Sequence, residues 1–459
     1  MPAILQSTAK PVKTSAVQMA SGTNEWRSGL LGRAGWYALI TVVFTMVFVN
    51  YSMRYGRLAV GPTDDDCNYL VDAIERLPLL HYTPKTFVLS LLQHPPHSPF
   101  STGLAVFAFT VFGPHQWAPY ACNGLLVFLL LLAVDYFTVR AGTEARIAAI
   151  VFVLFFPFTA NLITEFRPDC AIGLAGAFAI VLLLRQSPLA ASRNECLVIG
   201  LFAAFALLIK PSFAAFTIIT LAAAFGISAF LVNGERLWDA IKSKAWLSRL
   251  GWLALPGIVL ALPYYILSPH IVRYIQHQAF GKYHQHWAMK ETDLGNVLRY
   301  YWDGAGGQMM LGRHRYIMVA LGLAALLLLP KRAVSQWRFI VGYLAVVAVA
   351  YFIPSFARMA NPFFGAIADV LLLFGVVLLL RELLLEASTR PNRAAWLRGT
   401  AWATVALSVM AFSWPPPHFN KVSDWSETVN RLGRQIYESI RDHPNSRNAR
   451  VFFTAPGPV

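Results

Sequence analysis

Charged residues are scarce in this chain. Asp, Glu, Lys and Arg together make up 13% of its 459 residues, whereas hydrophobic residues make up 56%. An ordinary soluble domain carries about 25% charged residues. A soluble core of this length could not bury so much apolar surface. The scarcity of charge therefore excludes an ordinary soluble protein and indicates that lipid is the solvent.

Cysteine is also rare, and processing signals are absent. The four cysteines lack metal-ligand spacing, which argues against a zinc motif or a disulfide framework. The basic N-terminus precedes the first apolar run, but no small-residue cleavage site follows a short apolar core. We therefore predict that residues 1–34 form a retained cytosolic tail.

The charge that is present is mostly positive, with a net charge of +15. The lysines and arginines are scattered over many short loops, whereas a nucleic-acid-binding protein gathers them on one stripe or helix. We therefore expect anchoring of loops at membranes and no nucleic-acid partner.

Long apolar runs are abundant. Several contain about 17 to 22 residues with few charges, close to the roughly 20 residues with which a helix crosses the hydrocarbon layer. The runs are continuous rather than alternating, and only helices or closed barrels satisfy the backbone in lipid. The sequence therefore predicts an all-α polytopic membrane protein. About eleven spans are expected, at 35–51, 117–139, 146–163, 168–184, 197–209, 211–232, 250–268, 316–330, 338–354, 362–380 and 398–414.

The basic residues also predict the orientation. With the N-terminus inside, the Lys and Arg fall in short cytosolic connections, as the positive-inside bias requires. The segment 99–112 is too short to span and is expected to be re-entrant or interfacial. The odd number of spans places 415–459 outside as a tail, with an amphipathic helix and a strand-like run that could begin a truncated domain. The cytosolic connections are 140–145, 185–196, 233–249, 331–337 and 381–397.

Five clusters of ionisable residues gather on the predicted external face. This face includes the first loop (52–116) and the large loop 269–315. Charged groups at membrane depth cost about 2.5–3.5 kcal/mol each, so they are kept where partners or ligands hold them. Any one of them could be an interfacial loop charge, but together they indicate a site. The clusters are Asp64-Asp65-Asp66, Glu165 to Asp169, Lys210, the loop 269–315 and Arg358.

The acidic triplet has two interpretations. Three adjacent carboxylates repel one another and raise a proton affinity unless a cation offsets them, which suits a general base or a metal ligand. An acidic helix cap is the alternative. The loop 269–315, with His270, His277, His284 and His286, is expected to cover a cavity, and metal binding there is the less favoured alternative.

Five short motifs follow one another along the chain. They are Asp65-Asp66-Cys67-Asn68-Tyr69, His94-Pro95-Pro96 with Phe112-Gly113, Glu165-Phe-Arg-Pro-Asp169, Leu208-Ile-Lys210-Pro211 and Arg358-Met-Ala-Asn-Pro362. In this order they resemble the motifs of the type-C (GT-C) membrane glycosyltransferases, in the superfamily of protein O-mannosyltransferases and lipid A aminoarabinose transferases. The similarity covers residues 35 to about 380. A third acid, Asp64, and Met359 in place of a frequent Tyr depart from the family pattern.

The resemblance implies an enzyme that transfers a sugar from a polyprenyl-phosphate carrier to a lipid, glycan or protein acceptor, with inversion. The expected location is the bacterial inner membrane, with the site facing the periplasm and 35–414 forming the transferase domain. A multi-pass transporter or a non-catalytic binder of lipid-linked sugars is the alternative.

The resemblance also implies roles for single residues. Asp65 would be the base, with Asp64 as an alternative, and Asp66 would orient it or bind a divalent metal ion. Asp169 would position the acceptor or join Asp66 at that metal. The cations Lys210, Arg358 and Arg167 would hold the donor phosphate, and His94 would contact it.

Overall fold

We describe a computed structural model of the chain. It places residues 29–60, 65–186, 191–235, 242–268, 293–359 and 361–412, with single positions at 238, 271, 273, 277, 435 and 438. Every regular element in these ranges is a helix. Asp64, the His-rich part of the loop 269–315 and nearly all of the tail 415–459 lie outside the described residues.

Seven helical segments in the described residues are long and apolar enough to cross a membrane. An eighth candidate is α19 (Leu294–Trp302) and α20 (Ala305–Met310) together with α21 (His314–Leu328), a pair bent by 111°. The structure therefore confirms an all-α protein with seven or more candidate membrane-spanning helices. The seven are α2 (Leu30–Tyr55), α7 to α9 (Ala118–Leu154), α11 (Pro168–Arg185), η2 to η3 (Pro211–Val232), α15 to α16 (Lys244–Leu267), α23 (Trp337–Phe356) and η5 to α24 (Pro362–Thr389).

The segment Ala118–Leu154 reverses direction within its length. Asp135 in α8 (Gly124–Thr138) and Arg146 in α9 (Gly142–Leu154) form an ion pair with 2.7 Å between Oδ1 and Nε. Eleven residues of straight helix would separate their backbones by about 16 Å, farther than these two side chains reach. Gly142 between them has a φ of 86°, a conformation that glycine adopts without steric cost. Two helices therefore pack side by side here.

Further helices complete the bundle. They include α10 (Pro157–Thr164), α12 (Arg193–Ile209), α21 (His314–Leu328) and α25 (Pro391–Ala411). Each of the eleven predicted ranges is thus occupied by helix, although the number that cross the membrane stays a prediction.

The core is centred on α11 and α24 (Ala366–Thr389), which pack against each other. A Cβ at Gly173 would lie 2.8 Å from the carbonyl oxygen of Ala366. A glycine at this position is therefore what lets the two helix backbones approach.

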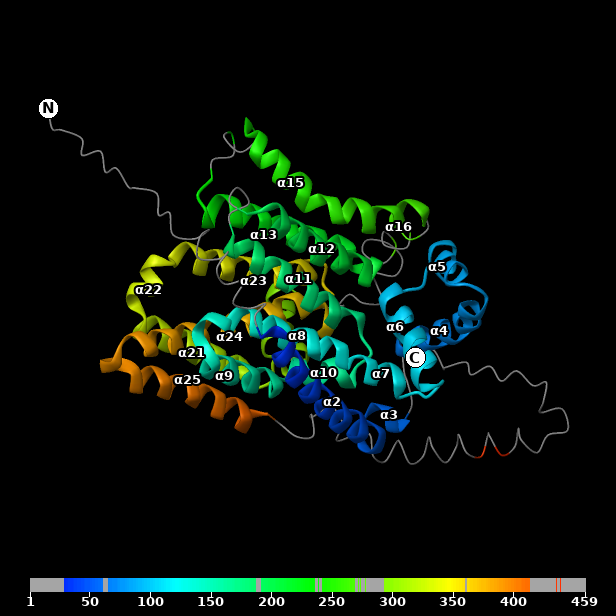
Figure 1. The fold of residues 1–459 in the computed structure, drawn as a ribbon, viewed down its shortest axis with the longest axis horizontal. Coiled ribbons are helices and arrows are strands. Elements are labelled where there is room, and N and C mark those ends of the chain that lie inside the picture. Colours follow the sequence, from blue (N-terminus) through cyan, green and yellow to red (C-terminus); the bar gives the residue numbers. More distant parts are fainter. Residues whose placement is uncertain are drawn as a thin grey trace.

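Four helices gather at one end of the bundle, which we call the α4 end: α3 (Arg57–Val60), α4 (Asp65–Tyr82), α5 (Pro84–Gln93) and α6 (Pro99–Phe112). At the opposite end, the α22 end, lies α22 (Pro330–Ser335) (Figure 1). Ser98 caps α6 by accepting from the amide of Ser101. With 14 residues, α6 has the length predicted for a re-entrant or interfacial segment.

Two carboxylates on neighbouring helices provide a test of this packing. Asp135 is fully buried and binds Arg33, Arg146 and the hydroxyl of Tyr37. Asp135→Asn removes the buried negative charge that pairs with Arg33 and Arg146, and we expect it to destabilise the fold by about 3–5 kcal/mol. Thermal melting of the purified protein in detergent measures the effect.

The matched control is Glu144→Gln, because Glu144 binds Arg398 with both side chains at least 36% exposed. Exposed pairs contribute about 0–1 kcal/mol, so this variant should melt almost as the wild type does. Equal melting of the Asp135 and Glu144 variants would contradict the buried network.

Candidate functional site

The centre of the site is Asp66, in the first turn of α4. Its carboxylate is fully buried, with Nε of Arg57 at 3.2 Å and Nε of Arg167 at 3.5 Å. The hydroxyl of Tyr120 donates a hydrogen bond of 2.6 Å to Oδ2. A buried carboxylate is tolerated when it is paired and hydrogen-bonded in this way. Asp66 is therefore held as a fixed anion.

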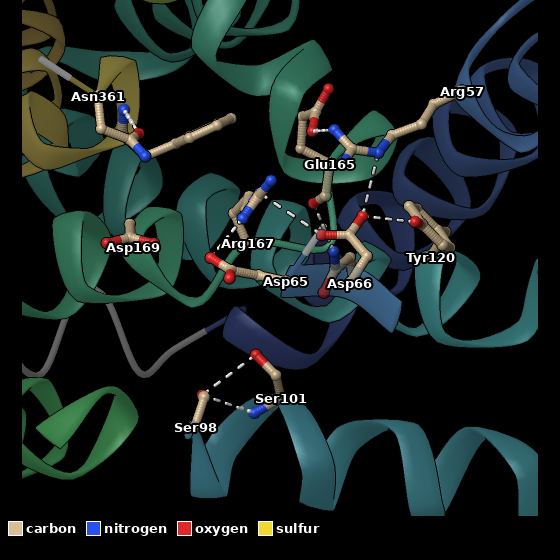
Figure 2. Close-up of polar contacts among 12 residues, drawn as sticks. Arg57, Asp65, Asp66, Ser98, Ser101, Tyr120, Glu165, Arg167, Asp169 and Asn361 are labelled. Atoms are coloured by element: carbon tan, nitrogen blue, oxygen red, sulfur yellow. Dashed lines mark hydrogen bonds and ion pairs between the residues drawn. The ribbon is translucent and has the colours of Figure 1, made fainter. Parts of the chain in front are cut away.

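Asp65 shares one of these cations but is more open. Nη1 of Arg167 lies 2.6 Å from its Oδ2, and the Asp65 side chain is 20% exposed. Arg57 continues the network by donating to Glu165, whose carbonyl oxygen accepts from Asn123 at 3.1 Å. Figure 2 shows Asp65 and Asp66 side by side, with Arg167 reaching toward both.

Carboxylates and guanidinium groups alternate through the described part of the network. Asp65, Asp66 and Glu165 pair with Arg57 and Arg167. Burial alone would lower the pKa of Arg57, but the Glu165 and Asp66 carboxylates outweigh it and raise that pKa above its ordinary value. The Arg57 guanidinium therefore stays charged beside these carboxylates.

A second ion pair joins the next two helices. Nζ of Lys210 lies 3.2 Å and 3.1 Å from the two carboxylate oxygens of Asp169, and both side chains are buried. Lys210 is the extended residue that ends α12, and Asp169 lies in the first turn of α11. The Lys-Pro and Pro-Asp sequences set these helix boundaries because proline cannot continue a helix from the preceding residue.

Tyr69 and His97 lie between the two ion-paired halves. Tyr69 is three and four residues after the Asp pair, so it shares their face of α4. Its ring centroid is 5.8 Å from that of His97. Tyr69 as a whole is 1% exposed, and its buried hydroxyl has no hydrogen-bond partner among the described residues. Burial, with the Asp65 and Asp169 charges, raises the pKa of Tyr69 well above its ordinary value.

The histidine of the site is His97 rather than His94. The side chain of His94 is exposed at the end of α5, and its carbonyl oxygen accepts from Arg76. Burial, followed by the Lys210 charge, lowers the pKa of His97 to about 4. His97 is therefore neutral at physiological pH. The motifs in the sequence did not indicate His97, although its position directly before Ser98, the cap residue of α6, could have done so.

The predicted arginine, Arg358, lies two residues beyond the end of α23. Arg358 has a φ of 54°, in the left-handed region, and its side chain is exposed. Tyr301 donates a hydrogen bond of 2.7 Å to the carbonyl oxygen of Met359. The ring of Phe363 in the same turn lies 5.5 Å from the guanidinium carbon of Arg167. No described residue forms an ion pair with Arg358.

The predicted metal ligands are engaged by protein cations. Asp66 faces two arginines and a phenol, and both oxygens of Asp169 accept from Lys210. Among the described residues, no group of three His, Cys, Asp or Glu side chains is arranged to hold a metal ion. The donor set does not fit a divalent metal, and we derive no step through one.

No known family model, curated protein or solved structure matches this chain. The function therefore has to be argued from the geometry of the site and from the order of its motifs. The structure brings together five of the residues with predicted roles, Asp65, Asp66, Arg167, Asp169 and Lys210. Tyr69 and Glu165, which belong to the predicted motifs without an assigned role, lie with them, and the structure adds Arg57, His97 and Tyr120.

Two tyrosines of the site should respond differently to loss of the hydroxyl. Tyr120→Phe removes a hydrogen bond to a charged group, which contributes about 1.5–3 kcal/mol, so its melting temperature should fall. Tyr69→Phe removes a buried hydroxyl that has no described partner, so its melting temperature should stay the same or rise. A lower melting temperature for Tyr69→Phe than for Tyr120→Phe would contradict this description.

The depressed pKa of His97 predicts an acid-sensitive stability. The unfolded chain binds a proton near pH 6.5, whereas the folded site does so only near pH 4. Stability from this residue is present above pH 6.5 and is lost as the pH falls to 4. His97→Gln should flatten the pH dependence of the melting temperature in that window. The control His115→Gln changes an exposed ring and should leave the wild-type slope; equal slopes in all three proteins would refute the assignment.

Proposed function

We propose that this protein is an inverting glycosyltransferase. It moves a sugar from a polyprenyl-phosphate carrier to a hydroxyl of a lipid, glycan or protein acceptor at the external face of a membrane, in bacteria the inner membrane. The observation that carries the proposal is the pairing of a partly exposed carboxylate, Asp65, with Arg167, in a cluster that also contains the ion pair of Lys210 and Asp169.

The proposal includes eleven crossings with the α4 end outside. Support comes from the charges at the α22 end, where the predicted cytosolic connections meet: Arg332 lies 3.9 Å from Glu382 and 3.7 Å from Glu386. Short cytosolic loops are enriched in such cations. The reversal at Gly142 supports counting 117–139 and 146–163 as separate spans.

Burial divides the roles of the two described aspartates. Asp66 has three polar partners and no exposure, so it holds Arg57 and Arg167 in place. Asp65 has one ion-pair partner and reaches solvent. A base must approach the proton that it accepts. Asp65 is therefore the base, and Asp66 positions Arg167, the arginine that pairs with Asp65.

The reaction is a single displacement. Asp65 accepts the proton of the acceptor hydroxyl as its oxygen forms a bond to the anomeric carbon. The bond from that carbon to the carrier phosphate breaks, and the electron pair leaves with the phosphate oxygen. Arg358 and Lys210 stabilise the departing anion, which makes a general acid unnecessary.

A transporter explains the site less well. Transporters bind substrate near the bilayer midplane at broken helices, often between repeated halves. Here the ionised groups lie at helix ends: Asp65 begins α4, Asp169 begins α11 and Lys210 ends α12. The cluster therefore faces a membrane surface.

Asp65→Asn tests the proposed base. The amide keeps the size of the side chain but cannot accept the proton, so transfer from a polyprenyl-phosphate sugar should fall by about 10²-fold to 10⁴-fold. Mass spectrometry of glycolipids and glycoproteins from membranes that carry each variant measures the transfer.

Glu75→Gln is the control, because it removes an exposed carboxylate from the same helix, α4, outside the ion-pair network. It should transfer at the wild-type rate. Full activity of the Asp65 variant, with normal insertion in the membrane, would refute the assignment of the base.

A further inference from the structure

A second charged cluster lies at the α22 end, far along the bundle from the candidate site. It consists of Arg140 in η1 (Val139–Ala141), Arg185 at the end of α11, and Arg381 in α24. Helix α24 packs against both η1 and α11, which brings the three together. Their charges repel one another, Arg185 with Arg381 and Arg140, and Arg381 with Arg140. We call these three residues the arginine cluster.

The carboxylates around the arginine cluster are already engaged. Glu382 is 3.2 Å from Arg381 and is shared with Arg332. Glu195 accepts from the Gln186 side chain at 3.0 Å and from the amide of Ser192 at 2.7 Å, where it closes the capping box of α12. The cluster therefore contains more positive than negative charge.

Two members of the cluster lack a counter-ion in the described part of the chain. Neither Arg140 nor Arg185 forms an ion pair there, and the guanidinium carbon of Arg185 instead lies 5.8 Å from the centre of the Phe137 ring. Nε of Arg381 is buried without a hydrogen-bond partner among the described residues. Three guanidinium groups thus present donors that fit the oxygens of a phosphate.

The position of the arginine cluster at the ends of apolar helices indicates which kind of molecule carries that phosphate. Arg140 follows the apolar helix α8, and Arg185 ends the apolar span α11. The cluster therefore lies where the hydrocarbon layer gives way to headgroups, and basic pockets between helices at this depth bind anionic lipid heads. We propose that the arginine cluster binds the phosphate of an anionic phospholipid. This site is separate from the proposed transferase site and does not depend on its function.

The test uses the full-length protein reconstituted in nanodiscs of phosphatidylcholine with increasing phosphatidylglycerol. Lipids that stay bound after transfer to detergent are counted by native mass spectrometry. We expect wild-type protein to retain phosphatidylglycerol about tenfold more than phosphatidylcholine. Arg140→Gln with Arg185→Gln should lose this preference. If the double variant fails to fold, each single variant is measured, and each should lose part of the preference.

The control is Arg398→Gln, which removes a cation that already pairs with Glu144, and it should retain phosphatidylglycerol as the wild type does. Inorganic phosphate is added in a parallel arm and should not displace the lipid. Three outcomes would overturn the proposal. The wild type could show no preference for phosphatidylglycerol. The preference could be unchanged in the double variant or in both single variants. Millimolar phosphate could displace the lipid.

Discussion

The guanidinium of Arg167, between the carboxylates of Asp65 and Asp66, is the contact on which the site depends. Without it, the carboxylates of buried Asp66 and partly exposed Asp65 would repel each other, with Arg57 paired to Asp66 alone. Arg167 and Asp169 flank Pro168, the first residue of α11. Through Arg167 this turn holds α4, and through Asp169 it holds the lysine that ends α12. One short turn therefore joins the helices of the α4 end to the core of the bundle.

Exposure distinguishes the two described aspartates. The Asp66 side chain is buried among Arg57, Arg167 and Tyr120, whereas the Asp65 side chain is 20% exposed and is the proposed base. The aromatic turn after Arg358 packs on two cations, with Phe363 5.5 Å from the guanidinium carbon of Arg167 and Phe364 5.5 Å from the Lys210 nitrogen. The face of an aromatic ring attracts a cation. The proposed base and the proposed phosphate-binding cations are therefore positioned by the same few side chains.

Apolar runs were sufficient to predict where helices lie, because lipid forces a continuous apolar stretch to be helical. They could not give the number of crossings, since α12 and α21 are short for a span and α25 is only weakly apolar.

Five site residues were predictable from their order along the chain. Arg57 and Tyr120 were not, because their partners are 108 and 54 residues away and sequence carries no distances. The motif indicates His94, whereas the structure places the ring of His97 beside Tyr69 and leaves the His94 side chain exposed.

The central claim is that the cluster at the α4 end receives the phosphate of a polyprenyl carrier. A cryo-electron microscopy map of the full chain with polyprenyl phosphate bound tests this directly. The account predicts phosphate density within hydrogen-bond distance of Lys210 or Arg167 and in contact with Arg358, with Asp65 facing the open side. Phosphate density that is absent from this cluster and present elsewhere, for instance at Arg140 and Arg185, would contradict it.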